Sequence, residues 1–285
     1  MKVILSRKGF DSKAGGIANP ILPDGTLLSL PIPMSNDCNK YSDLIYNGDK
    51  IYGDKTFLEI IRELTSNPKF SDITCHLDPD IRKDVKKRSK NWKPLFGQQD
   101  IAQAILKKCN VKIGDIFLFF GWFKETHIVN GKLCFKKGTP DRHIIYGYLQ
   151  IGKIHNDMTK LPDELKYHPH AIIENYDKKR NCIYEATKRL TFQKGIDGAG
   201  CFKFNESLVL TKTGRTRSFW ALPKSFHPDN DVILSSHLPK NNNWSIEDNY
   251  SILKTVPQGQ EFVFTADPNR EVEKWCMNLI EENSK

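Results

Sequence analysis

Three features that the sequence lacks exclude whole classes of protein. The seven cysteines include no CxxC pair, which argues against a disulfide scaffold and against a cysteine-rich zinc site. No apolar run approaches the roughly 18 residues that a transmembrane helix needs. The apolar run Val3–Leu5 is too short to be the core of a signal peptide. We therefore expect a cytoplasmic protein without a membrane partner.

Motifs typical of phosphate-binding loops and of serine hydrolases are missing as well. The chain contains no GxGxxG, no GxxxxGK(S/T) and no GxSxG. An excess of positive charge is present instead, with 43 Lys and Arg against 34 Asp and Glu and a formal net charge of +9. This excess favours an anionic partner such as DNA or free nucleotides. The charged fraction of 27% is ordinary, so the chain is expected to fold.

The hydrophobic pattern predicts one compact α+β domain over residues 1–285. Residues 116–123 form a continuous apolar run between turn residues, which is typical of a buried strand. Apolar residues at 57, 60, 61 and 64 repeat with helical spacing, and so do those at 272, 275, 276, 279 and 280. We expect a β-rich, strongly curved sheet or a small barrel, with short peripheral helices and a C-terminal amphipathic helix.

Residues 143–154 form a second predicted strand whose two faces differ. Tyr146, Tyr148 and Gln150 share one face, and aliphatic residues share the other. Two aromatic rings and an amide on an open face are suited to stacking against and reading an extruded base.

The segment that follows the first predicted strand is rich in polar groups. Arg7, Lys8 and Asp11 lie there between two serines, a composition that can hold a phosphate and a sugar. A solvated turn after an edge strand is the simpler explanation of these residues taken alone.

Two short segments carry histidine. His76, Asp78 and Asp80 are close enough in sequence to form a metal site or an acid–base pair. His168 and His170 share one face if their segment is extended. Both segments are also typical of turns and loops without a ligand, and a metal site needs ligands from elsewhere in the fold. On the sequence alone we assign no metal ligand.

A late predicted strand opens with Gln260 and Glu261. Alternation places Glu261 on the same face as Val263, so this carboxylate is a candidate for burial. A buried carboxylate needs an oppositely charged partner or a function. An edge-strand glutamate in water is the alternative.

Seven of the 12 residues from 82 to 93 are Lys or Arg, and Trp92 lies among them. Such a cluster can bind a phosphate backbone, while a solvated surface that only aids solubility is an equal alternative. Further cations follow at Lys178, Lys179, Arg180, Lys212, Arg215 and Arg217. The predicted phosphate-binding residues are Arg82, Lys86, Lys87, Arg88, Lys90, Arg215 and Arg217.

Several segments together resemble a known family. They are SRKGFDS at 6–12, SLPIP at 29–33, HLDPD at 76–80, FGQ at 96–98, GDIFLFFGWF at 114–123, YGYLQIG at 146–152, SFWALP at 218–223 and GQEFV at 259–263. In this order they are similar to the third family of nucleotide modification associated domains of bacteria and phages. The resemblance implies a setting of DNA base modification, and it carries no agreed catalytic set.

A second resemblance concerns residues 111–155, which are similar to the core of PUA-like barrels such as EVE and ASCH domains. Those folds often read modified or extruded bases, so the resemblance implies recognition of a base. It agrees with the grouping of the two tyrosines and the glutamine on one face.

These resemblances and the residue patterns lead to one functional hypothesis, the recognition or processing of modified nucleotides or bases in DNA. A non-catalytic partner subunit of a modification or restriction system is the alternative, and the sequence identifies no cofactor. The candidate catalytic residues are Arg7, Asp11, His76, Asp78 and Glu261. The candidate base- or nucleotide-binding residues are Lys8, Gln98, Trp122, Tyr146, Tyr148, Gln150 and Gln260.

Overall fold

The computed structural model describes most of the chain. The described residues are 1–47, 52–65, 70, 73–172, 180–230, 243–255, 260–265 and 270–284. Of the residues named from the sequence, Lys178, Lys179 and Gly259 lie outside them.

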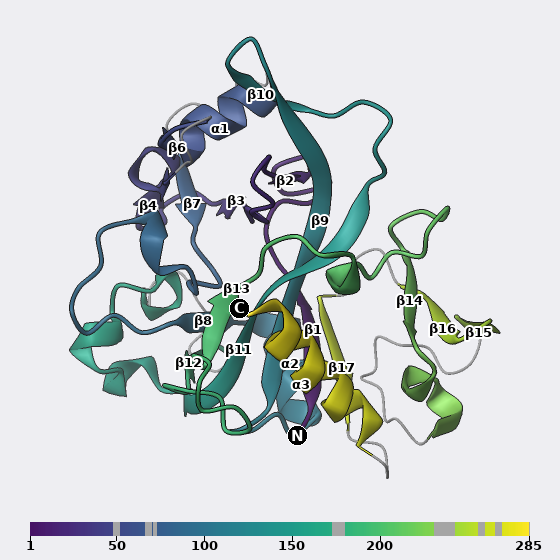
Figure 1. The fold of residues 1–285 in the computed structure, drawn as a ribbon. Coiled ribbons are helices and arrows are strands. Elements are labelled where there is room, and N and C mark those ends of the chain that lie inside the picture. Colours follow the sequence, from purple (N-terminus) through teal and green to yellow (C-terminus); the bar gives the residue numbers. More distant parts are fainter. Residues whose placement is uncertain are drawn as a thin grey trace.

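A large mixed sheet forms the centre of the molecule (Figure 1). Its path runs β17-β1-β9-β11-β12-β8, and three further strands pair along its length. Strand β1 runs parallel to β9, whereas β17 is antiparallel to β1 and β11 is antiparallel to β9. The strands are β1 (Val3–Arg7), β2 (Asn19–Ile21), β8 (Leu95–Gln98), β9 (Ile116–Val129), β10 (Lys132–Phe135), β11 (Arg142–His155), β12 (Cys182–Ala186), β13 (Ala199–Cys201) and β17 (Glu261–Phe264).

The predicted α+β class and curved sheet are present, and the sheet is not closed into a barrel. Its terminal strands β8 and β17 share no backbone ladder among the described residues. The sheet nevertheless curves far enough for Gln98 Nε2 of β8 to lie 2.5 Å from Glu261 Oε1 of β17. The curvature therefore brings side chains from both ends of the sheet together.

Strand β11 differs from the prediction of one open face. All residues from His143 to Ile151 are buried, so both faces lie in the core. Phe202 stacks on Tyr148 with ring centroids 5.3 Å apart. A register shift between Ile145 and Gly147 also interrupts simple alternation against β9. The face that the sequence pattern presents as open is covered by other parts of the chain.

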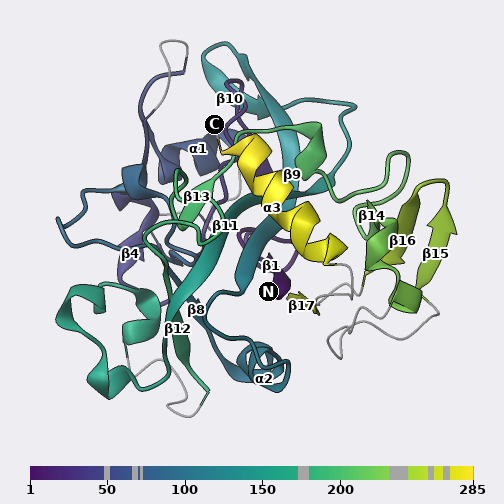
Figure 2. The same cartoon turned by 60° about the horizontal axis from the view of Figure 1, so that its bottom comes forward.

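Smaller sheets and, within the described part of the chain, three α-helices surround the central sheet. The remaining strands are β3 (Ile32–Pro33), β4 (Asn39–Lys40), β5 (Ile45–Tyr46), β6 (Lys55–Thr56), β7 (Thr74–His76), β14 (Phe219–Pro223), β15 (Trp244–Glu247) and β16 (Tyr250–Lys254). The helices are α1 (Phe57–Leu64), α2 (Asp100–Lys108) and α3 (Glu271–Asn283). The sheet β14-β16-β15 lies on the opposite side of the molecule from α1 and β4 (Figures 1 and 2).

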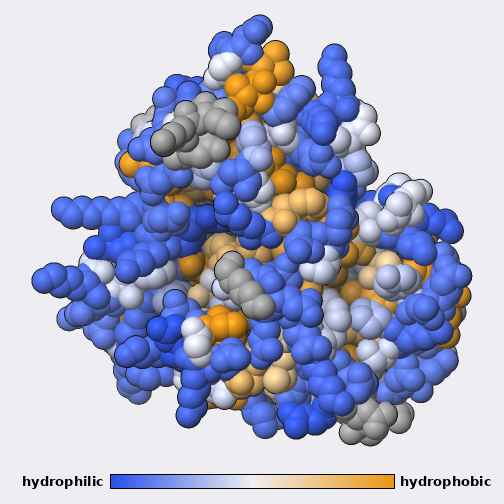
Figure 3. All heavy atoms as spheres, in the orientation of Figure 1, coloured by the Kyte–Doolittle hydropathy of each residue, from blue (hydrophilic) through white to orange (hydrophobic). Residues whose placement is uncertain are grey.

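The C-terminal helix α3 packs on the main sheet as the spacing predicts. Val272, Cys276, Leu279 and Ile280 belong to the same apolar cluster as β1 and β9. The described residues contain no helix that is both long and apolar enough to cross a membrane. On the face shown in Figure 3, apolar residues appear in separate patches within a mostly hydrophilic surface.

Helix α1 begins with a complete capping box. Thr56 Oγ1 accepts a hydrogen bond from the Glu59 amide at 3.2 Å, and the Glu59 carboxylate accepts one from the Thr56 amide at 2.7 Å. We expect Thr56→Ala to lower the free energy of unfolding by about 1 kcal/mol, because the Glu59 amide loses its side-chain acceptor. Urea unfolding measures the loss, and the exposed Thr213→Ala is the matched control. Equal stability of both variants would contradict a role for the cap.

Candidate functional site

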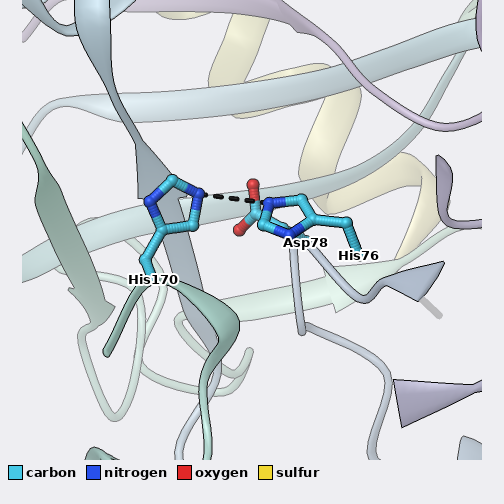
Figure 4. A group of neighbouring side chains, drawn as sticks. All are labelled: His76, Asp78 and His170. Carbon is cyan, nitrogen blue, oxygen red and sulfur yellow. Dashed lines mark hydrogen bonds between the residues drawn. The ribbon is translucent and has the colours of Figure 1, made fainter. Parts of the chain in front are cut away.

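A cluster of buried imidazoles lies where β7 meets the segment that contains His168 and His170. His76 ends β7, and its Nδ1 lies 2.8 Å from Asp37 Oδ2. Its Nε2 lies 3.2 Å from Nε2 of His170. The two rings therefore face each other through the same type of nitrogen, with the Asp78 carboxylate beside them (Figure 4).

Asn181 fixes the orientation of His170. The Asn181 amide nitrogen donates to the backbone carbonyl of His170 at 2.7 Å, which directs Asn181 Oδ1 at the ring. That oxygen lies 2.7 Å from His170 Nδ1, so Nδ1 carries the proton and donates it. Burial lowers the pKa of His170 to about 3, and the ring is neutral near pH 7.

Asp78 lies two residues after His76 and faces the same cluster. Its Oδ1 accepts a hydrogen bond from the Gly97 amide at 2.6 Å and lies 3.2 Å from His168 Nε2. Burial opposes ionisation of Asp78, but the hydrogen bond with His168 and the electrostatic effects of His170, His168 and Lys8 outweigh it. Together they hold the pKa of Asp78 well below its ordinary value. Asp78 is therefore a carboxylate at neutral pH.

Glu261 forms a second buried polar group close to the first. Its side chain is fully buried, and Oε1 accepts hydrogen bonds from Ser6 Oγ at 2.8 Å and from Gln98 Nε2 at 2.5 Å. The Lys8 ammonium lies 3.6 Å from the same oxygen and 4.4 Å from the centre of the Phe96 ring. Burial raises the pKa of Glu261 to about 7, although Lys8 acts in the opposite direction. Glu261 can thus exchange a proton near neutral pH.

Strand β8 joins the two groups into one site. The Gly97 amide binds Asp78, and the next side chain, Gln98, binds Glu261. Lys8 also acts electrostatically on both carboxyl groups. The site therefore combines a carboxylate that stays charged, a carboxyl that titrates near pH 7 and a shared ammonium.

A glycine is required at position 97 because the His170 ring packs directly on it. A Cβ built at Gly97 would lie 2.1 Å from His170 Cδ2. We expect Gly97→Ala to displace the ring and to lower the free energy of unfolding by about 1–3 kcal/mol, as overpacking does. Urea unfolding and the NMR resonances of the histidine rings measure both effects.

The matched control for this substitution is Gly195→Ala. A Cβ at Gly195 meets only a side-chain oxygen at 3.5 Å, which is an ordinary contact. Unchanged histidine resonances in Gly97→Ala would show that the ring does not depend on this close approach.

The cavity beside the cluster is small. It has a volume of about 30 Å³ and is lined by residues that include Asp78, Arg82, Tyr146 and Cys201. This volume holds about one water molecule. A nucleobase therefore does not fit into it in the conformation described.

Two predicted catalytic residues lie elsewhere. Strand alternation places Arg7 on the opposite face of β1 from Ser6 and Lys8, and its guanidinium lies 5.7 Å from the centre of the Phe120 ring. Burial lowers the pKa of Arg7 to about 10. Asp11 accepts hydrogen bonds from the amides of residues 13 and 14, which closes a turn. The structure unites His76, Asp78 and Glu261 but not Arg7 or Asp11.

Among the predicted base-binding residues, Lys8 and Gln98 belong to the site. Tyr146 reaches the small cavity, whereas Tyr148 donates a hydrogen bond to the Asp197 carbonyl at 3.0 Å. Gln150 is fully buried and donates to the Gly114 carbonyl and to Thr191.

Trp122 and Gln260 lie away from the histidine cluster. Trp122 Nε1 donates to Asp141 at 2.8 Å, and the Arg217 guanidinium lies 4.0 Å from the centre of the Trp122 ring. Gln260 is exposed, and its carbonyl accepts the amide of Arg7. Base binding by these residues stays a prediction.

The predicted phosphate-binding cations have mixed surroundings. Arg88 makes two short hydrogen bonds to the Asp80 carboxylate, and Lys86 donates to Asn39. Arg82 donates to the Leu27 carbonyl, whereas Lys87 and Lys90 are exposed. Arg215 lies 3.7 Å from Glu247. Phosphate binding stays a prediction, and exposure favours Lys87 and Lys90 over Arg88.

The sequence gives little sign of two important members of the site. Asp37 and Asn181 orient the imidazoles from segments that are 39 and 11 residues distant from their partners. Asp37 and Asn181 could have been identified only if the contacts of their segments with His76 and His170 had been known. The sequence did show the histidine pair at 168 and 170, but it did not show that His170 lies against His76.

Comparison with known proteins assigns the family. A family model described as nucleotide modification associated domain 3 matches residues 2–265 of the 285. Neither a curated protein nor a solved structure is significantly similar to the chain. The matched range contains every residue of the two joined polar groups. Because the match covers far more than half of its length, the chain belongs to the nucleotide modification associated domain 3 family.

Proposed function

We propose that the protein is an enzyme that processes nucleotides or bases during DNA modification, with Glu261 as the acid–base group and the Lys8 ammonium beside it. Membership of the family supports the nucleotide setting. The observation that carries the catalytic part is the pairing of a fully buried Glu261 with an ammonium 3.6 Å away, beside the buried Asp78. Burying such charges costs several kcal/mol, which a purely structural core avoids by using apolar residues.

The different states of the two carboxyl groups favour an enzyme over a binding module. Asp78 remains ionised, whereas Glu261 titrates near pH 7. Neighbouring carboxyl groups whose pKa values are shifted in opposite directions are a recurring acid–base arrangement. A binding surface for a base requires no such arrangement.

A turnover assay on a defined substrate panel tests the proposal. The panel contains nucleoside monophosphates and triphosphates and matched duplexes, with unmodified or 5-substituted pyrimidines. Mass spectrometry of the digested nucleosides detects any change in mass. We expect a product from at least one modified pyrimidine and none from protein that has been denatured by heat.

The same panel distinguishes the alternatives. Saturable binding of one modified duplex without any product would support a binding module. If neither product nor binding occurs, and the protein copurifies with another protein of a modification system, the partner-subunit alternative replaces the enzyme.

A further inference from the structure

The ring nitrogens of His76 and His170 are arranged as metal ligands are. Each Nδ1 faces an oxygen, that of Asp37 or that of Asn181, and the two Nε2 atoms face each other. In proteins, a metal-bound imidazole commonly donates its other N–H to a carboxylate or a carbonyl. Such a partner holds the ring in place and fixes its tautomer.

These partners determine where the lone pairs point. A carboxylate only accepts hydrogen bonds, so His76 Nδ1 is protonated when it contacts Asp37. The amide of Asn181 is oriented by its bond to the His170 carbonyl, so His170 Nδ1 is protonated too. In the neutral rings, both Nε2 lone pairs then point into one space. Lone pairs 3.2 Å apart repel each other, and either a shared proton or a metal ion between them removes this repulsion.

The separation of the nitrogens fits a shared ion. Bonds of 2.0–2.1 Å at angles between octahedral and tetrahedral values place two nitrogens about 2.8–3.4 Å apart. The observed distance of 3.2 Å lies within this range. The ligand atoms of His76, Asp78 and His170 all lie within 4.8 Å of one another, and the three residues are buried.

We propose that His76 Nε2, His170 Nε2 and the Asp78 carboxylate bind one divalent first-row transition-metal ion. Two imidazoles and one carboxylate are suited to Zn²⁺ or Fe²⁺, whereas Mg²⁺ and Ca²⁺ prefer oxygen ligands throughout. The charges of Asp78 and Asp37 offset the charge of the ion.

Metal binding by the full-length protein tests this site independently of the proposed enzymatic function. The protein is treated with a chelator, dialysed and titrated with Co²⁺ by visible absorption and with Zn²⁺ by calorimetry. We expect one equivalent to bind, with Co²⁺ d–d bands typical of mixed nitrogen and oxygen ligands. We also expect Zn²⁺ to raise the melting temperature, because an ion that binds the folded state alone stabilises it.

Substitutions locate the ion. His170→Ala and Asp78→Asn remove ligands and are expected to abolish the stoichiometric binding. Asp37→Asn touches no metal but weakens the partner of His76, so we expect a loss of affinity of about 10–100-fold. His127→Ala removes an exposed histidine, and it is not expected to change binding.

Two outcomes would overturn the proposal. One is a folded wild-type protein that binds neither Co²⁺ nor Zn²⁺ stoichiometrically, which would mean that the two imidazoles share a proton instead. The other is unchanged binding in folded Asp78→Asn and Asp37→Asn, which would place the ion elsewhere. Circular dichroism shows whether each variant is folded. If a variant that lacks a ligand does not fold, the affinity of Asp37→Asn for the ion tests the proposal.

Discussion

Replacing Glu261 by Gln is expected to lower kcat by about 10²–10⁴-fold, the usual contribution of a general acid or base. The substituted amide oxygen can still accept the hydrogen bonds from Ser6 and Gln98, so we expect the fold to be retained. The proton that Glu261 exchanges is lost. Turnover of the substrate found in the panel measures the effect, and the exposed Glu282→Gln is the matched control.

Although Glu261→Gln is expected to be less active than the wild type, it is expected to be more stable above neutral pH. The pKa of Glu261 is raised on folding from 4.5 to about 7. Between these values the native state binds more protons than the unfolded state, so wild-type stability falls as the pH rises and is constant above both values. A glutamine at position 261 resembles the protonated glutamic acid, so the variant does not lose stability as the pH rises. At pH 8 we expect Glu261→Gln to be the more stable protein, by up to about 3 kcal/mol.

Several charged groups face Glu261 and contribute to this profile. Lys8 favours its ionised form, while the carboxylate of Asp78 opposes it, and Tyr184 lies close enough for its own pKa to be affected. Urea unfolding at pH 5 and pH 8 separates the variant from wild type. A variant that is fully active, or less stable than wild type at both pH values, would contradict the acid–base role.

Arg88→Ala is expected to lower the free energy of unfolding by about 3–5 kcal/mol, the usual cost of removing one partner of a buried ion pair. The side chains of Arg88 and Asp80 are only 6% and 3% exposed. Arg88 also lies over the Trp92 ring, whose Nε1 donates to the same carboxylate. Without the guanidinium, Asp80 stays buried with its principal charge partner removed.

This prediction separates the structural role of Arg88 from the predicted phosphate contact. Lys87→Ala, an exposed neighbour, is expected to change the stability by less than about 0.5 kcal/mol. If Lys87 contacts DNA, its removal lowers the salt dependence of binding instead. A stable Arg88→Ala protein with weaker DNA binding would show that Arg88 serves the phosphate backbone.

Short sequence patterns correctly predicted those helices and strands that depend mainly on neighbouring residues. The helical spacing of α1 and its Thr56 cap, the apolar run of β9 and the amphipathic α3 all form as expected. Alternation made Glu261 a candidate for burial and left exposure at a sheet edge as the alternative; in the structure all four residues of β17 are buried. Each of these inferences needs only a few neighbouring residues.

Features that depend on distant contacts were beyond the sequence. Alternation grouped Tyr148 and Gln150 correctly on one strand, but it does not show that Phe202 and Thr191 cover them. His76 and His170 are 94 residues apart, and only the folded chain brings their rings together. The curvature of the sheet, which brings β8 to β17, likewise arises from packing along the whole chain.

The two adjacent residues Gly97 and Gln98 have a thermodynamic consequence. The Gly97 amide donates a hydrogen bond to Asp78, which lies in the histidine cluster, and the Gln98 side chain donates one to Glu261. If a cation at the histidines shifts the proton affinity of Glu261, linkage requires protonation of Glu261 to shift the affinity for that cation by the same factor. The cation affinity of the protein then also varies with pH around the pKa of a residue that does not itself touch the ion.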